Sequence, residues 1–210
     1  MSKRGLFITL EGPEGSGKST HGRRLSRWLR SRGVPVLFTR EPGGTALGQR
    51  LRKLLLDHHS DQIDPLVELC LYEASRAILV RQVILPALRS GRVVILDRFQ
   101  DSTWVYQGWA GGMSLKLVEQ LGEACTRGLV PDVTILLDLP VRKGLARVKR
   151  PNRMEAKSVA FHQKVRRGYL ALARRNRKRF RVIRTDGSAD QVQQDIRKAL
   201  QDVLAQYRRT

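Results

Sequence analysis

The chain has 210 residues with 40 Lys or Arg against 19 Asp or Glu, a formal net charge of +21, and a hydrophobic fraction of 41%. These values are typical of one globular domain with a full core, and they exclude a low-complexity chain. The apolar runs are much shorter than the roughly 20 residues that cross a bilayer, and the run at 6–10 is too short for a secretory signal. We therefore expect a cytoplasmic protein without membrane contact.

The positive charge is concentrated in the C-terminal third. Residues 142–210 contain 21 Lys or Arg and 5 Asp or Glu, against 19 and 14 in residues 1–141. A polyanionic partner such as nucleic acid explains this excess, and so do solvated helix faces. Nucleic-acid-binding segments usually interleave aromatic residues for stacking, whereas "RRNRKRF" offers only Phe180. We favour solvated faces and keep nucleic-acid contact as the weaker alternative.

The Cys and His residues give no pattern of metal ligands. Cys70 and Cys125 are isolated thiols, which predicts reduced and buried structural cysteines. His58 and His59 are adjacent in a polar stretch, which favours a loop over a metal site. We predict no structural metal.

Short apolar segments alternate along the chain with amphipathic segments of helical length. In chain order the sequence predicts a strand at 6–12, a helix at 18–33, a strand at 34–40, helices at 45–56 and 65–89, a strand at 92–98, a helix at 114–128, a strand at 131–139, a helix after Pro140, a longer helix from about Lys157, a strand at 180–187 and a helix from Ala189. Continuous apolar strands such as "VVIL" are typical of a sheet covered on both faces. The predicted fold class is α/β, one domain with a mostly parallel five-stranded, doubly wound sheet.

The segment "GPEGSGKS" at 12–19 fits the pattern G-x-x-x-x-G-K-[ST] between a predicted strand and a predicted helix. Its glycines let backbone N–H groups form an anion-binding nest at a helix N-terminus. Lys18 can then reach the β- and γ-phosphates of ATP, and the Ser19 hydroxyl can ligate Mg²⁺. The sequence therefore indicates a P-loop NTPase-type fold in which the following residues bind ATP: Gly12, Pro13, Glu14, Gly15, Ser16, Gly17, Lys18, Ser19 and Thr20.

Residues that follow other strands suggest a second ligand. Asp97 can hold Mg²⁺ or its waters and Arg98 can bridge two phosphates, although such a pair can also simply form a turn. The Pro-Gly-Gly bend in "TREPGGT", 39–45, can admit a second substrate. Tyr72 and Arg76 lie four apart on one helix face, which suits a flat base with carbonyl acceptors. Spacing alone, however, favours a core aromatic and a surface arginine.

Several longer segments complete the pattern: "EGPEGSGKST", "TREPGGT", "LRKLLL", "LYEASR", "ILPAL", "DRFQDSTWVYQG", "PDVTILLD" and "FHQKVRRGY". In these the chain resembles bacterial thymidylate kinases nearly from end to end. The resemblance implies a phosphotransferase that uses ATP and Mg²⁺ to convert dTMP to dTDP for dTTP supply, and it implies a homodimer.

The resemblance also implies a role for individual residues. Lys18 and Ser19 would contact ATP, Ser19 and Asp97 would hold Mg²⁺ directly or through water, and Arg98 would touch the phosphates of both nucleotides. For dTMP, it assigns the phosphate to Arg52, stacking on thymine to Tyr72, a thymine carbonyl to Arg76, the base edge to Thr103 and Gln107, the deoxyribose face to Tyr106 and the sugar 3′-OH to Glu14.

The family's phosphate loop sometimes carries a catalytic arginine, but Glu14 and Ser16 stand in this loop. The resemblance then places the extra cation in a short basic lid at about 147–157. Its candidates are Arg147, Lys149, Arg150 and Arg153, of which Arg153, beside Glu155, is favoured, while Arg147 is expected to contact ATP. The catalytic set expected is Lys18, Arg98, Arg153 and Glu14.

The chain departs from the family pattern at several positions. The lid is shorter than usual, and Asn152, Tyr72, Phe99 and Val105 replace residues that are common there. Tyr72 matters most, because a buried hydroxyl needs a partner.

Two alternatives remain open. Another nucleoside monophosphate kinase differs in its acceptor. A nucleic-acid-binding P-loop ATPase is supported by the basic C-terminal third and opposed by the acceptor-site residues from Arg52 to Gln107.

Overall fold

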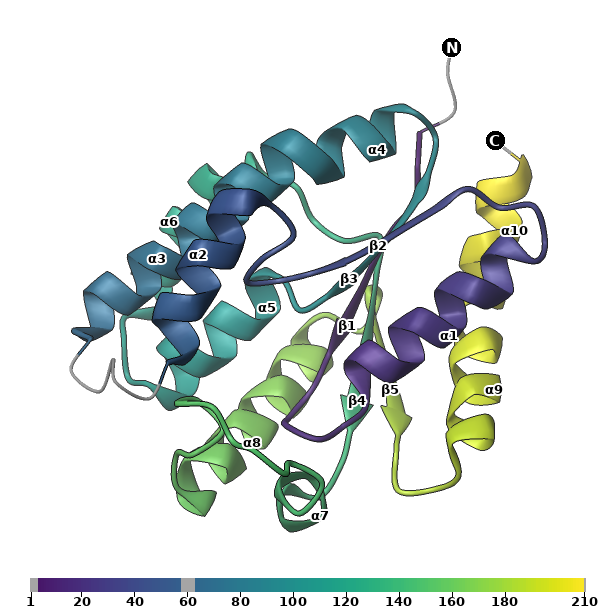
Figure 1. Ribbon diagram of the computed structural model, residues 1–210. Helices are drawn as coiled ribbons and strands as arrows, with labels where there is room; N and C mark the ends of the chain where they lie inside the picture. Colours follow the sequence, from purple (N-terminus) through teal and green to yellow (C-terminus); the bar gives the residue numbers. More distant parts are fainter. Residues whose placement is uncertain (1–3, 58–62, 210) are drawn as a thin grey trace.

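The computed structural model describes residues 4–57 and 63–209 (Figure 1). Its five strands pair in the order β2-β3-β1-β4-β5, and every pairing is parallel. The strands are β1 (Phe7–Glu11), β2 (Val36–Arg40), β3 (Val93–Asp97), β4 (Val133–Asp138) and β5 (Phe180–Arg184). The predicted five-stranded α/β sheet is confirmed.

Helices cover both faces of this sheet (Figure 1). One face packs on α1 (Lys18–Arg30), α9 (Ala189–Ala199) and α10 (Gln201–Arg209). The other face is covered by α3 (Pro65–Leu79), α4 (Leu85–Arg89), α6 (Leu115–Thr126) and α8 (Val159–Arg175), with α2 (Ala46–Leu56) against α3. Adjacent strand residues divide between the two layers: Ile8 and Ile95 pack toward α1, whereas Phe7 and Val94 pack toward α4. This is why the strands read as continuous apolar runs.

Local sequence signals fix where the helices begin. The Asp64 side chain accepts from the N–H groups of Leu66 and Val67, and Pro65 occupies the first turn of α3. Thr45 caps α2 in the same manner, by accepting from the Gly48 N–H. The helix predicted at 65–89 forms, but a π-helical turn, η1 (Val80–Ile84), interrupts it just before Pro86, which has no N–H to donate.

Residues 100–110, for which the sequence predicted no element, form α5 (Gln100–Thr103) and a π-helical segment, η2 (Trp104–Ala110). The final predicted helix divides at Leu200 into α9 and α10. A short α7 (Val141–Leu145) follows Pro140 as expected. None of the described residues belongs to a helix with the length and apolarity needed to cross a membrane.

Cys70 lies on α3 and Cys125 lies on α6. The prediction of buried cysteines is wrong, because Cys70 is exposed on α3 and Cys125 is partly exposed on α6. Helices that cover a sheet leave part of their surface to solvent, and neither thiol is fully covered. The loop expected at His58 and His59 lies outside the described residues.

Candidate active site

The phosphate loop at 12–19 connects β1, at the centre of the sheet, to α1. Gly12, Gly15 and Gly17 adopt positive φ angles of 143°, 67° and 88°. A Cβ at Gly15 would lie 2.0 Å from the carbonyl oxygen of Gly144, so the close approach to α7 requires glycine there. The glycine spacing thus shapes a loop whose N–H groups precede the positive end of α1.

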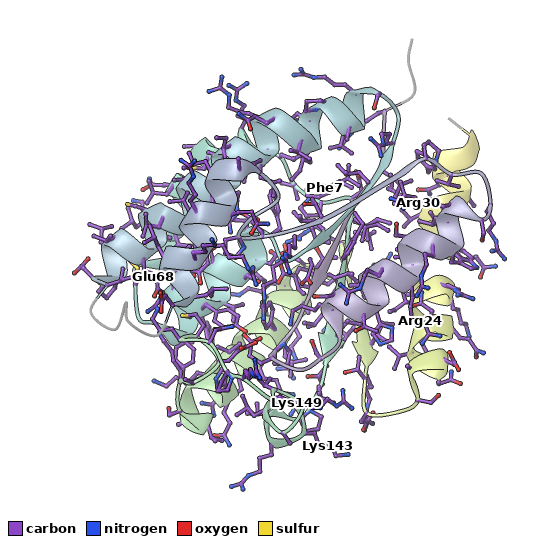
Figure 2. All side chains as sticks on the ribbon, viewed as in Figure 1. Phe7, Arg24, Arg30, Glu68, Lys143 and Lys149 are labelled. Atoms are coloured by element: carbon purple, nitrogen blue, oxygen red, sulfur yellow. The ribbon has the colours of Figure 1, made fainter. Side chains whose placement is uncertain are left out.

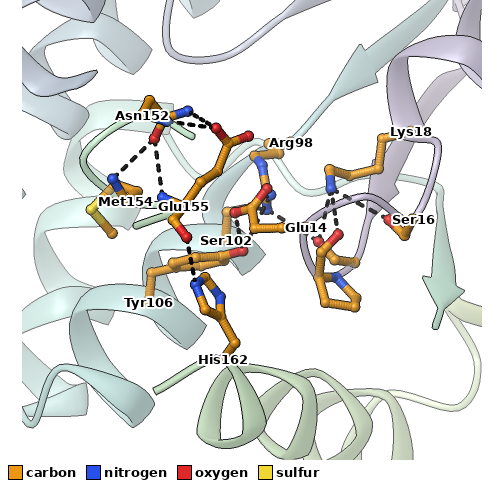
Figure 3. A network of polar contacts seen from close by, with 12 residues as sticks. Glu14, Ser16, Lys18, Arg98, Ser102, Tyr106, Asn152, Met154, Glu155 and His162 are labelled. Carbon is orange, nitrogen blue, oxygen red and sulfur yellow. Dashed lines mark hydrogen bonds and ion pairs between the residues drawn. The ribbon is translucent and has the colours of Figure 1, made fainter. Parts of the chain in front are cut away.

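Lys18, in the first turn of α1, folds back over this loop. Its Nζ donates to the carbonyl oxygens of Pro13, at 2.8 Å, and Gly12, at 3.0 Å (Figure 3). Burial and the neighbouring Arg98 charge lower the pKa of Lys18 to about 8, against the opposing effect of Glu14. The ammonium therefore lies in a site where further negative charge, such as a phosphate, stabilises its ionised form.

Ser19 and Asp97 are brought together by the pairing of β1 with β3, in which Leu10 is opposite Asp97. The Ser19 hydroxyl donates to Asp97 Oδ2. A hydroxyl and a carboxylate at the mouth of a phosphate loop are hard oxygen donors that fit Mg²⁺. Within the described residues no group of three or more His, Cys, Asp or Glu could hold a metal alone. A metal here would take its other ligands from phosphates and water.

Arg98, directly after β3, has a positive φ of 70°, which is costly for a residue with a side chain. Its guanidinium donates to Glu14 Oε1 at 2.9 Å and to the Tyr106 hydroxyl at 3.2 Å (Figure 3). It also donates to the Tyr169 hydroxyl at 3.0 Å. Five hydrogen bonds in total, including those to Ser102 Oγ and the Gly12 carbonyl, hold the strained position. Backbone strain that is held by many contacts is typical of functional sites.

Glu14 points out of the phosphate loop toward Arg98. Burial raises its pKa, but the charges of Arg98 and Lys18 outweigh burial and hold the pKa at about 2. The Tyr106 hydroxyl also donates to Glu14 Oε1, at 2.7 Å. The carboxylate is thus ionised and directed away from the phosphate-binding nest.

Two adjoining cavities meet at this pair. The acceptor cavity, about 110 Å³, is lined by Glu14, Arg52, Tyr72, Arg98, Tyr106 and Gln107, six of the residues singled out from the sequence. The phosphate-loop cavity, about 380 Å³, contains Lys18, Ser19, Thr20, Asp97 and Arg147. Both cavities are lined by Glu14, Glu41, Arg52, Arg98 and Glu155. The arrangement can bind two phosphorylated ligands with Arg98 between them.

Comparison with known proteins agrees with this geometry. A family model described as thymidylate kinase matches residues 10–196. The chain belongs to the thymidylate kinase family. The thymidylate kinase of Desulfosudis oleivorans is 47% identical over 94% of this chain and 97% of that protein, and that of Deinococcus radiodurans is 46% identical over 95% and 98%. The crystal structure of thymidylate kinase from Ehrlichia chaffeensis superposes with a TM-score of 0.79 at 34% identity, covering 94% of this chain and 99% of that one.

In this member of the thymidylate kinase family, Arg76 is buried, with 2% of its surface exposed, so the surface arginine favoured by spacing alone is wrong. Its Nε lies 2.9 Å from Glu41 and its Nη1 lies 2.6 Å from Glu73. Its Nη2 donates to Thr103 Oγ1 at 2.8 Å. Two carboxylates compensate the buried charge. Arg76 and Thr103 do not line the acceptor cavity; they lie behind it.

Tyr72 is not a core aromatic. It is partly exposed and lines the acceptor cavity, while burial of its hydroxyl raises its pKa. Arg52, on α2, donates to the Pro42 carbonyl at 2.9 Å, which directs its guanidinium to the same cavity. Pro42 belongs to the bend at 39–45 that suggested a second ligand.

The residues 147–157, the lid segment, contain no helix or strand. Arg147 donates to the Gly15 carbonyl at 3.2 Å. Arg147, Lys149 and Arg150 all line the phosphate-loop cavity. Arg153, the lid cation favoured from the sequence, is elsewhere: it pairs with Glu68 and donates to the Leu55 carbonyl at 3.0 Å.

The turn that directs Arg153 away is made by Asn152. Its Oδ1 accepts from the N–H groups of Met154, at 2.9 Å, and Glu155, at 3.2 Å, and its amide donates to the Glu155 carboxylate (Figure 3). Arg153 therefore leaves the turn toward the buried carboxylate on α3. In this structure the lid cations at the phosphate loop are Arg147, Lys149 and Arg150.

Sequence reasoning missed the residues that support Arg98. Glu11, at the end of β1, accepts from the Phe99 N–H at 2.7 Å, from Ser102 Oγ at 2.6 Å and from the Tyr169 hydroxyl at 2.9 Å. Burial and Asp101 raise the pKa of Glu11 to about 7. The available signal was an acidic residue ending a strand that is otherwise apolar.

Proposed function

We propose that the protein transfers the γ-phosphoryl group of ATP to dTMP, giving dTDP and ADP. The observation that supports this best is the position of Arg98 at the junction of the two cavities, where a transferring phosphoryl group would lie. Phosphoryl transfer needs alignment of two anionic substrates and cations that offset the charge on the transferring group. The enzyme would act without a covalent intermediate.

The donor side rests on the phosphate loop. Its N–H groups and Lys18 would bind the phosphates of ATP, and Arg147 would contact the nucleotide from the lid. Ser19 and Asp97 would hold Mg²⁺, directly or through water; when bound, this ion would offset charge on the phosphates. The buried position of Lys18 makes its interaction with phosphate stronger than in water.

On the acceptor side, Arg52 would hold the dTMP phosphate and Tyr72 would stack on the base. Gln107 would reach the base edge, and Tyr106 would lie against the deoxyribose, with Glu14 facing the sugar 3′-OH. Arg76 and Thr103 do not line the acceptor cavity, and Arg76 donates a hydrogen bond to Thr103. They would affect the base by supporting the cavity through this hydrogen bond, or would contact the base after a shift toward the cavity.

The lid segment would close over the phosphates. Since Arg153 is paired with Glu68, the cation that offsets the charge of the transferring group would come from Arg147, Lys149 or Arg150. All three side chains are exposed and reach the phosphate-loop cavity, so a nucleotide would draw them inward. We propose that residues 1–210 act as one kinase domain with this lid.

We also propose a cytoplasmic homodimer. Exposed apolar side chains gather on two helices that pack together, Leu47 and Leu54 on α2 and Leu66 and Val67 on α3. A second copy of the chain covering this face would remove them from water. ATP and dTMP as substrates favour the cytoplasm.

The test of the proposed reaction is ADP release from ATP and Mg²⁺ with and without dTMP. Release that requires dTMP supports the proposal. Release that is independent of any monophosphate and stimulated by DNA or RNA would favour the nucleic-acid-binding ATPase, for which the basic C-terminal third is the support.

A further inference from the structure

A buried carboxylate outside the proposed reaction machinery joins the acceptor cavity to the lid. Glu68 lies near the start of α3 (Figure 2) and is 7% exposed. Its Oε1 accepts from Gln107 Nε2 at 2.8 Å, and its Oε2 accepts from Arg153 Nη2. One carboxylate thus receives a donor from η2 and a donor from the lid segment.

The chemistry of Glu68 determines which way the Gln107 amide faces. An ionised carboxylate only accepts hydrogen bonds, whereas the two ends of an amide differ: the nitrogen donates and the oxygen accepts. The reversed amide would place two acceptors together in a buried site, which is unfavourable because neither would have a donor. The amide nitrogen therefore stays on Glu68, and the amide oxygen is turned to the other side.

Gln107 lines two cavities. One, about 470 Å³, also contains Glu68 and Arg153, and the other is the acceptor cavity, which contains neither. With its nitrogen fixed in the first, Gln107 has its oxygen available to a ligand in the second. Arg153 holds the other carboxylate oxygen and keeps Glu68 from turning away, so this orientation depends on the lid.

We propose that Glu68 is a positioning residue that makes Gln107 a hydrogen-bond acceptor toward the substrate base. Thymine and uracil carry an N–H at ring position 3, which such an oxygen accepts, while cytosine carries an unprotonated nitrogen there. Glu68 therefore sets the preference for thymine over cytosine. This inference rests on the proposed function, since it requires that Gln107 reach the base edge.

The first test replaces the carboxylate by a group of the same shape that both donates and accepts. In Glu68→Gln the Gln107 amide can take either orientation. We expect the ratio of kcat/KM for dTMP to that for dCMP to fall by about tenfold or more, with the KM for dTMP raised and the KM for ATP unchanged. Glu68→Asp keeps an acceptor-only group and is expected to retain most of the ratio.

Glu119→Gln is the matched control, because the Glu119 carboxylate accepts from Trp104 Nε1, at 2.9 Å, and lines neither of the two cavities that Gln107 lines. A folded Glu68→Gln protein with the wild-type ratio, or with equal changes in the KM of both substrates, would overturn the proposal. Wild-type protein without dTMP-dependent turnover would instead overturn the proposed function.

A second test needs no variant. dTMP methylated at ring nitrogen 3 lacks the donor, so we expect the wild-type enzyme to lose at least about tenfold in kcat/KM with it. Turnover equal to that of dTMP would show that Gln107 is not held as an acceptor, whether or not the Glu68 variants fold.

Discussion

Arg98 Nη2 lies 2.9 Å from Glu14 Oε1 at the junction of the acceptor and phosphate-loop cavities. Both side chains are largely buried, and the pair holds the pKa of Glu14 at about 2. A carboxylate beside the phosphate loop is thereby directed to the acceptor side. The Nε–H of Arg98 takes part in none of the five hydrogen bonds described above and can be donated to a phosphate oxygen.

Replacing Arg98 should impair the chemical step. Lysine keeps the charge but loses the planar fork that contacts Glu14 and the Tyr169 hydroxyl together. We expect Arg98→Lys to lower kcat by about 100-fold or more. Steady-state ADP release measures it, with Arg92→Lys as a control, since Arg92 donates to the Val36 carbonyl away from both cavities. An Arg98→Lys enzyme with wild-type kcat would contradict the assignment.

Removing the Lys18 ammonium should abolish turnover and leave the fold intact. The side chain is desolvated and its partners are the Gly12 and Pro13 carbonyls and Ser16, so the folded state gains little from its charge. Lys18→Ala is expected to melt at or above the wild-type temperature in thermal unfolding, while ADP release disappears. Persisting activity in a folded Lys18→Ala protein would remove the phosphate-loop argument.

Arg76→Ala should destabilise the protein, independently of its proposed role at the base. Truncation leaves the Glu41 and Glu73 carboxylates buried without their shared cation. We expect a loss of about 3–5 kcal/mol in the free energy of unfolding by urea. Arg81→Ala on η1, an exposed arginine nearby, should cost little. Unchanged stability with a raised KM for dTMP alone would favour direct base contact.

The unfolding free energy should fall as pH rises through neutrality. Burial raises the pKa of Glu41 to about 7 from its ordinary 4.5, although Arg76 opposes the shift. A carboxyl that binds its proton more tightly when folded stabilises the fold below pH 4.5 and loses this contribution as pH rises through 7. The loss is at most about 3 kcal/mol.

The pKa of Glu11 is also raised, so its titration lowers the unfolding free energy over the same pH range. The contribution of Glu41 therefore has to be measured by comparing the wild type with a variant. Urea unfolding of wild type and Glu41→Gln between about pH 5 and pH 8 isolates the contribution of Glu41, because the variant cannot titrate there. The Glu41→Gln curve should be flatter. Parallel curves would show that Glu41 has an ordinary pKa in the folded protein.

The features predicted well are those whose cause is local. The glycine spacing at 12–19, between an apolar strand and an amphipathic helix, was enough to predict the phosphate loop, because a few consecutive residues determine its shape. The parallel sheet followed from strands that are apolar on both faces.

The features missed depend on residues distant in sequence. Burial of Arg76 requires Glu41, on a separate strand-end loop, and no helical spacing reveals that partner. The placement of Arg153 depends on Glu68 in the same manner. The segment 100–110 joins a short α-helix to a π-helical segment and is largely buried, so it shows no clear period of 2 or 3.6.

The most direct measurement of the central claim is coupled ADP release with ATP and Mg²⁺, run separately with dTMP, dUMP, dCMP, dGMP and AMP. The geometry at Arg98, Tyr72 and Gln107 predicts turnover with dTMP well above that with dCMP, dGMP and AMP. Equal or faster turnover with one of those three would contradict the assignment of the acceptor cavity and indicate another nucleoside monophosphate kinase.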